Sequence, residues 1–275
     1  MKSFFGFQNT KERRVRLMKY KVIPALSLII GVSLIFALAA SAEESLGWYC
    51  VRQKDHKQPK CDSNMQYIEE YDGYYIDHAH GDACEEKVIY LTFDAGYENG
   101  NVEKILDTLK EENVPGAFFI LGNLIERNGE LVRRMADEGH IVANHTYSHG
   151  DMTKVGAGSF NAELEKLSEA YKELTGKDMP RYFRPPEGKF SRSMMENAKS
   201  AGYKTIFWSF AYADWDNGKQ PDCDYAKEKI LSNIHNGAVL LLHPTSSTNA
   251  AVLGDVIREL KGQGYRFGTL DELTA

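Results

Sequence analysis

The feature that most constrains the fold is a repeated alternation of short apolar segments and amphipathic segments, which begins at Lys87. The apolar segments, which we interpret as strands, are 88–93, 117–121, 141–143, 182–184, 205–208, 239–242 and a weaker one near Phe267. The amphipathic segments, which we interpret as helices, are 101–111, 124–138, 162–175, 191–200, 225–234 and 251–263. Alternation of this kind predicts a parallel sheet, either doubly wound or closed as a barrel.

The residues before Lys87 form two further parts. Residues 1–42 contain seven basic residues and an uncharged apolar run at 22–42, and Ala40-Ser41-Ala42 before Glu43 has the form of a signal-peptide cleavage site. The run is close to the roughly 20 residues that span a bilayer, so cleavage and retention as a membrane anchor both stay open. In either case we expect the rest of the chain to be exported. Residues 43–86 have no sustained period, and we interpret them as an extended segment that packs on a single domain at 87–275.

The exported part is acidic. The formal net charge is −6 for the whole chain, and because residues 1–42 hold seven basic residues and one acidic residue, it is −12 for the remainder. Nucleic-acid binding needs a basic surface and is therefore excluded as a function.

The chain has four cysteines without the CxxC spacing of many structural zinc sites: Cys50, Cys61, Cys84 and Cys223. Export permits a disulfide. A Cys50–Cys61 pair and a bridge that involves Cys84 both stay open, since spacing alone does not give the pairing.

Side chains capable of chemistry follow five of the predicted strands, at the point where each strand ends. They are Asp94, His145 with His149, Arg184, Asp214 with Trp215, and His243. The carboxyl ends of parallel strands meet at one rim, so we expect these side chains to lie together.

His145 and His149 are four residues apart. We expect one helical turn to place both imidazoles on one face, where two neutral rings can bind Zn²⁺ or a similar divalent ion. The alternative is a helix cap that carries two ordinary surface histidines.

Five motifs occur in a fixed order along the chain. They are Thr92-Phe93-Asp94-Ala95-Gly96, Asn144-His145-Thr146-Tyr147-Ser148-His149, Arg184-Pro185-Pro186, Asp214-Trp215 and Leu240-Leu241-Leu242-His243. From residue 87 to 274 the chain thus resembles the NodB-homology polysaccharide deacetylases, carbohydrate esterase family 4. The resemblance implies a distorted (β/α) barrel with the active site at the carboxyl ends of the strands. The stretches 96–100, 184–188 and 207–209 are similar to the delta-lactam-biosynthetic branch, which deacetylates muramic acid in spore-cortex peptidoglycan.

The resemblance implies a division of roles in proton transfer. Asp94 is expected to be the general base that activates the attacking water, and Arg184 to orient Asp94. His243 is expected to be the general acid that protonates the leaving amine, with Asp214 tuning its pKa. Histidine suits this task because its pKa lies near neutrality.

The resemblance also implies that His145 and His149 hold the metal, zinc or another divalent ion. In most of the family a second aspartate follows the base and ligates the metal, but here that residue is Ala95. We therefore expect weak metal binding. Asp151 or Glu98 stays open as a replacement ligand.

The substrate follows from the resemblance and from charge. Trp215 and Leu241 are expected to wall the acetyl pocket. Muramic acid freed of its peptide carries a lactyl carboxylate, and Arg184 and Lys189 are the cations that the sequence offers near the rim.

The expected function is hydrolysis of the N-acetyl group of N-acetylmuramic acid in peptidoglycan strands. We expect a monomer that acts after an N-acetylmuramoyl-L-alanine amidase and leads to muramic delta-lactam in the spore cortex. Deacetylation of N-acetylglucosamine in a wall or chitin-like glycan is the first alternative. A non-catalytic glycan-binding relative is the second.

Overall fold

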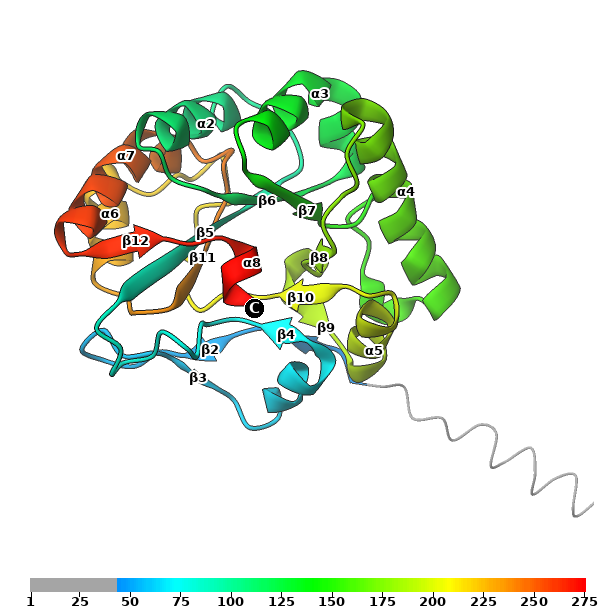
Figure 1. Ribbon diagram of the computed structural model, residues 1–275, viewed down its shortest axis with the longest axis horizontal. Coiled ribbons are helices and arrows are strands. Elements are labelled where there is room, and N and C mark those ends of the chain that lie inside the picture. Colours follow the sequence, from blue (N-terminus) through cyan, green and yellow to red (C-terminus); the bar gives the residue numbers. More distant parts are fainter. Residues whose placement is uncertain (1–43) are drawn as a thin grey trace, which may run out of the picture. The chain divides into compact units, whose positions relative to one another are not determined.

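A curved parallel sheet of eight strands forms the centre of the protein (Figure 1). The computed structural model describes residues 44–275. The strand order is β11 (Ala238–Leu242), β5 (Lys87–Ala95), β6 (Ala117–Ile120), β7 (Ile141–Asn144), β8 (Tyr182–Phe183), β10 (Lys204–Ile206) and β4 (Gly73–Tyr74), with β12 (Tyr265–Phe267) also on β5. Isolated bridges, Phe210 to Leu240 and Ile76 to Ala238, join the chain beyond β10 and β4 back to β11. The sheet therefore curls toward itself, which confirms the predicted distorted (β/α) barrel.

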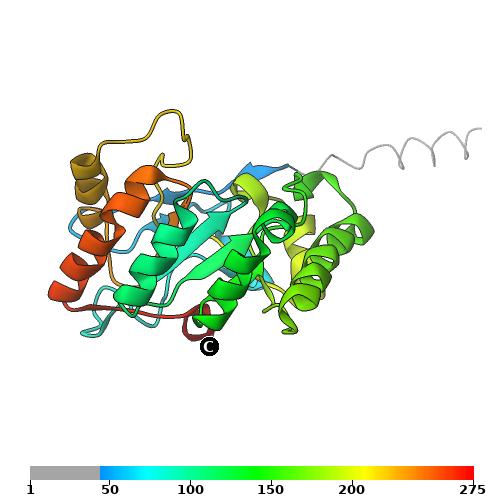
Figure 2. The same cartoon turned by 90° about the horizontal axis from the view of Figure 1, so that it is seen from above.

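Helices surround the sheet, as Figures 1 and 2 show. They are α2 (Val102–Glu111), α3 (Gly122–Asp137), α4 (Ala157–Thr175), α5 (Arg192–Ser200), α6 (Cys223–Leu231) and α7 (Ser247–Gly262), followed by the short α8 (Leu270–Leu273). Each predicted helix is present, but α4 and α7 begin five and four residues earlier than predicted, and α3 and α6 begin two residues earlier. In α7 the Ser246 hydroxyl accepts a hydrogen bond from the Asn249 N–H at 3.0 Å, so a polar run that resembles a loop is in fact the capped first turn.

The segment before Lys87 contains short elements. β1 (Leu46–Gly47) pairs antiparallel with β9 (Lys189–Phe190), and β2 (Cys50–Val51) pairs antiparallel with β3 (Lys60–Cys61). The 3₁₀ helix η1 (Gln66–Tyr71) leads into β4, which pairs in parallel with β10. Strands of two residues are too short to show a period, which is why the sequence pattern gave no sign of them.

Alternate residues of β5 pack on opposite sides of the sheet, as strand geometry requires. Ile89, Leu91 and Phe93 belong to an apolar cluster shared with the helices. Val88 and Tyr90 belong to a second cluster inside the barrel. Apolar side chains thus fill the barrel near the amino ends of the strands, and the charged residue Asp94 lies at the carboxyl end of β5.

No helix between residues 44 and 275 combines the length and apolar character that crossing a membrane requires. The predicted signal or anchor segment at 1–42 lies outside the described residues.

Candidate active site

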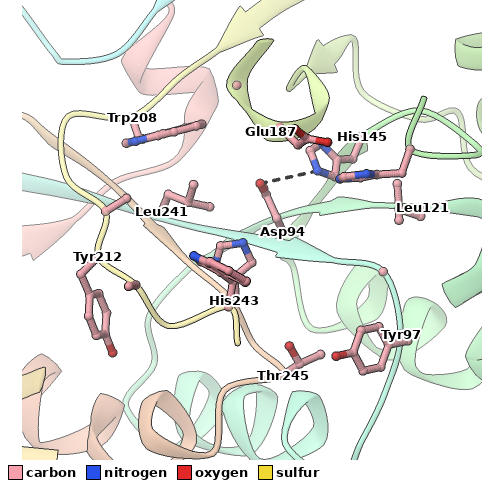
Figure 3. A pocket seen from close by; sticks show the side chains of 16 residues that line it. Asp94, Tyr97, Leu121, His145, Glu187, Trp208, Tyr212, Leu241, His243 and Thr245 are labelled. Atoms are coloured by element: carbon pink, nitrogen blue, oxygen red, sulfur yellow. Dashed lines mark ion pairs between the residues drawn. The ribbon is translucent and has the colours of Figure 1, made fainter. Parts of the chain in front are cut away.

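A cavity of about 930 Å³ opens at the carboxyl ends of the strands (Figure 3). Six predicted site residues line it: Asp94, His145, His149, Trp215, Leu241 and His243. Figure 3 shows Asp94 between His145 on one side and His243 on the other. Arg184 and Asp214 lie behind this layer and contact it.

A buried arginine holds Asp94 in place. Arg184 has no exposed surface, and its Nη1 donates to Asp94 Oδ1 at 2.9 Å. Its Nη2 donates to the Thr92 hydroxyl at 2.9 Å and to the Phe207 carbonyl at 3.2 Å, and its Nε donates to the Ile206 carbonyl at 2.9 Å. These bonds fix the guanidinium in one geometry beneath the cavity.

The buried guanidinium bears on the predicted roles of both Asp94 and Arg184. Burial disfavours the charged form of Asp94, but the charge of Arg184 keeps the pKa of this carboxyl below its ordinary value. Asp94 is therefore an ionised carboxylate with 11% of its side chain exposed. The prediction that Arg184 also binds a substrate carboxylate is wrong, because the guanidinium is fully buried and each of its nitrogens is already bonded.

The two histidines of the metal motif lie in a loop and not in a helix, so the predicted helical turn is wrong. The Asn144 side chain accepts the Thr146 N–H at 2.9 Å and turns the chain after β7. Thr146 (φ 71°) and His149 (φ 61°) adopt the left-handed conformation, and the Thr146 hydroxyl accepts the His149 N–H at 2.9 Å. This turn brings the two rings to a centroid distance of 5.0 Å, so the expected pairing is present through a different backbone.

His145 is set up to act as a neutral base or ligand. Its Nδ1 lies 2.8 Å from the Arg184 carbonyl, which can only accept, so Nδ1 carries the proton. Burial lowers the pKa of His145 to about 4, so the ring is neutral at pH 7. The lone pair on Nε2 then faces the cavity, 3.6 Å from Asp94 Oδ2.

These features fit a divalent ion held by two imidazoles. Within residues 44–275, no set of three or more His, Cys, Asp or Glu side chains is arranged to hold a metal ion. The Glu98 carboxylate accepts backbone N–H groups at the start of α2, and Asp151 accepts the Thr153 N–H and pairs with Lys154. Both candidate replacement ligands are therefore engaged elsewhere, and water or substrate would have to complete the coordination.

A second carboxylate holds His243. Asp214 is 1% exposed; its Oδ1 lies 2.7 Å from His243 Nδ1, and its Oδ2 accepts the His243 backbone N–H at 2.8 Å. Burial disfavours the imidazolium, but the hydrogen bond and charge of Asp214, with the charge of Asp94, raise the pKa of His243 above its ordinary value. The remaining ring nitrogen, Nε2, is the one available to the cavity.

Asn249, in the first turn of α7, completes this arrangement. Its Nδ2 donates to Asp214 Oδ2 at 2.6 Å and to the His243 carbonyl at 3.0 Å. This residue was not predicted, because the apolar pattern of the helix begins only at residue 251. A helix cap at Ser246 was the available signal.

The cavity walls are mainly apolar. Leu241 is 5% exposed and Trp215 is 65% exposed, so Leu241 forms part of the floor and Trp215 stands at the rim. Trp208 and Glu187 also line the cavity and were not predicted. Lys189 is not among the lining residues described; its ammonium pairs with Glu187 at 2.6 Å.

Comparisons with known proteins agree with this geometry. Residues 81–206 match the family model for polysaccharide deacetylase. Over 252 residues the chain is 39% identical to the peptidoglycan-N-acetylmuramic acid deacetylase PdaA of Bacillus subtilis, covering 90% of this chain and 94% of that protein. The solved structure of Bacillus subtilis PdaA, a family 4 carbohydrate esterase, gives a TM-score of 0.79 at 40% identity and covers 84% of this chain and 97% of that chain. A peptidoglycan-N-acetylglucosamine deacetylase of Bacillus cereus is 34% identical over 200 residues, 68% of this chain and 88% of that protein.

The barrel, the ionised Asp94 and the His243–Asp214 pair define a site suited to hydrolysis by general acid–base catalysis. The chain belongs to the polysaccharide deacetylase family, carbohydrate esterase family 4, which confirms the resemblance seen in its motifs. The prediction of an enzyme is confirmed with it. Deacetylases of this family are generally metal-dependent, in agreement with the paired imidazoles of His145 and His149.

Proposed function

We propose that the protein hydrolyses the N-acetyl group of N-acetylmuramic acid in peptidoglycan strands. The observation that carries the proposal is the placement of an ionised Asp94 and of His243, whose pKa Asp214 raises, on the same cavity, each held by a buried partner. The similarity to a muramic acid deacetylase over nearly the whole of both chains supports the choice of sugar.

In the proposed mechanism Asp94 accepts a proton from the water that attacks the acetamide carbon. The low pKa of this carboxyl keeps it ionised and ready to accept, and Arg184 fixes its direction. His243 then gives a proton from Nε2 to the departing nitrogen as the C–N bond breaks. The products are acetate, which contains the water oxygen, and a free amine on the sugar.

His145 and His149 would hold zinc or another divalent ion. Such an ion would polarise the acetyl carbonyl and lower the pKa of the attacking water. Leu241 would contact the acetyl methyl group from the floor of the cavity, and Trp215, at the rim, would contact the sugar.

We infer that the enzyme is exported or anchored by residues 1–42 and acts as a monomer. It would follow an N-acetylmuramoyl-L-alanine amidase and supply the amine for muramic delta-lactam in the spore cortex. Removal of the peptide opens access to the lactyl side of the sugar, which is why the amidase would act first.

Acetate release from intact and from amidase-treated peptidoglycan tests this order. We expect faster release after amidase treatment. Equal rates on both substrates would overturn the order. The N-acetylglucosamine alternative draws support from the Bacillus cereus relative, and a chitin oligomer as third substrate separates it from the proposal.

A further inference from the structure

Cys50 and Cys61 lie directly opposite each other in the antiparallel pair β2–β3. Residues opposite in such a ladder have Cα atoms about 4.5–5.5 Å apart, within the range of about 4.4–6.8 Å that a disulfide spans. Both thiols are free and half-buried in the structure. The backbone thus already has a spacing that a bridge requires.

The β2–β3 pair lies behind a wall of the catalytic cavity. Trp48, two residues before Cys50, donates its Nε1–H to the Trp208 carbonyl at 2.8 Å and stacks on Phe207 at a centroid distance of 4.5 Å. The Cys50 sulfur itself lies 3.5 Å from the same Trp208 carbonyl. Trp208 lines the cavity, so the position of this segment bears on the shape of the wall.

We propose that Cys50 and Cys61 form a disulfide that fixes residues 48–61 against the Trp208 wall. Formation requires a disulfide oxidant, such as oxidised glutathione or a dithiol–disulfide oxidoreductase. One cysteine thiolate attacks the oxidant and releases one thiol, and the second thiolate then attacks the mixed disulfide and releases the other. Two S–H bonds are lost and one S–S bond forms, while the oxidant takes up two electrons and two protons.

The environment of the thiols predicts when the bridge forms. Burial, with a smaller contribution from the charge of Cys61, raises the pKa of Cys50 to about 12. Burial, followed by the charges of Glu69 and Asp62, raises the pKa of Cys61 to about 11. The thiolate is the reactive form, so the folded dithiol reacts slowly. We therefore expect the bridge to form during folding and not from the packed dithiol.

The other two cysteines are placed differently. Cys84 lies in the turn before β5, where its carbonyl accepts from the Asn236 side chain, and Cys223 is exposed at the start of α6. Within the described residues, neither is the ladder partner of another cysteine. They supply matched controls for the proposal.

The test is refolding of the full chain from denaturant in a glutathione redox buffer, followed by alkylation under denaturing conditions without reductant. We expect two of the four cysteines to be alkylated, with a cross-linked peptide that joins Cys50 to Cys61. Four alkylated cysteines, or a cross-link to Cys84 or Cys223, would overturn the proposal.

Stability and exchange give independent readouts. Closing a loop of this size should raise Tm by about 6–12 °C relative to the reduced chain. Amide exchange at residues 46–51 should slow in the oxidised form. The double variant Cys84→Ser, Cys223→Ser should keep both differences, and the double variant Cys50→Ser, Cys61→Ser should lose them. If the second variant does not fold, the peptide map of the wild-type chain still decides the question.

Discussion

Replacement of Asp214 by asparagine tests the general-acid arrangement most sharply. In the native site the two carboxylate oxygens of Asp214 serve different partners: Oδ1 lies against His243 Nδ1 at 2.7 Å, and Oδ2 accepts from Asn249 at 2.6 Å and from the His243 backbone at 2.8 Å. An asparagine that keeps its oxygen toward the two fixed donors must turn its NH₂ group toward Nδ1. That group can only donate, so it favours the neutral ring with its proton on Nε2 and removes the imidazolium.

The expected loss has two parts. A hydrogen bond to a charged group contributes about 1.5–3 kcal/mol, which corresponds to a factor of about 10–150 in rate. Loss of a positioned general acid accounts for about 10²–10⁴-fold. We therefore expect kcat to fall by about 10²–10⁴-fold for Asp214→Asn, with little change in the melting temperature.

The pH dependence of kcat shows in which direction Asp214 shifts the pKa of His243. His243 must be protonated to act as an acid, so activity is present below its pKa and is lost as pH rises through it. Asp214 raises that pKa against the opposing effect of burial, so its removal should move the alkaline limb of kcat to lower pH. Asn249→Ala keeps the carboxylate and should have a smaller effect on both quantities. A kcat within threefold of wild type with an unmoved alkaline limb would show that Asp214 does not set the protonation of His243.

Four further predictions concern the base, its support, the metal and the rim. Asp94→Asn should lower acetate release by about 10²–10⁴-fold without loss of glycan binding, and a pull-down that shows lost binding would contradict this role. Arg184→Ala leaves Asp94 without its buried partner and should lower the free energy of unfolding by about 3–5 kcal/mol, measured in urea. A change below about 1 kcal/mol would show that the buried ion pair does not stabilise the fold. Mild chelation should abolish activity, and added Zn²⁺ should restore it. His149→Ala should lower zinc retention on dialysis. Full activity after exhaustive chelation would show that the reaction needs no metal. Glu187→Gln frees the Lys189 ammonium and should lower KM for peptide-free glycan. Lys189→Ala should raise this KM, with kcat little changed in both variants. Equal KM values for the two variants would exclude Lys189 from substrate binding.

The sequence predicted the barrel well because its strands and helices have strong and different periods. It also placed Asp94, His145 and His243 at one rim, because parallel strands of known direction have their carboxyl ends together. The strand contributed by the segment before Lys87 could not be predicted from periodicity, because β4 is two residues long and joins the sheet through its partner β10.

Side-chain detail was the harder part to predict. The left-handed turn at Thr146 and His149 depends on the Asn144 side chain, and a spacing of four residues is equally typical of a helix. The sequence likewise could not show that Arg184 is fully enclosed and bonded, because enclosure depends on Phe207 and Ile206, which are distant in the chain. Local patterns therefore located the site, and tertiary contacts decided what each group can do there.

Mass spectrometry of glycan fragments can show which sugar of the peptidoglycan loses its acetyl group. Amidase-treated peptidoglycan would be incubated with the enzyme and cut into disaccharides by a muramidase. We expect loss of the acetyl group from the muramic residue and its retention on the glucosamine residue, with no loss in the Asp94→Asn control. Loss from the glucosamine residue, or no loss from either sugar, would contradict it.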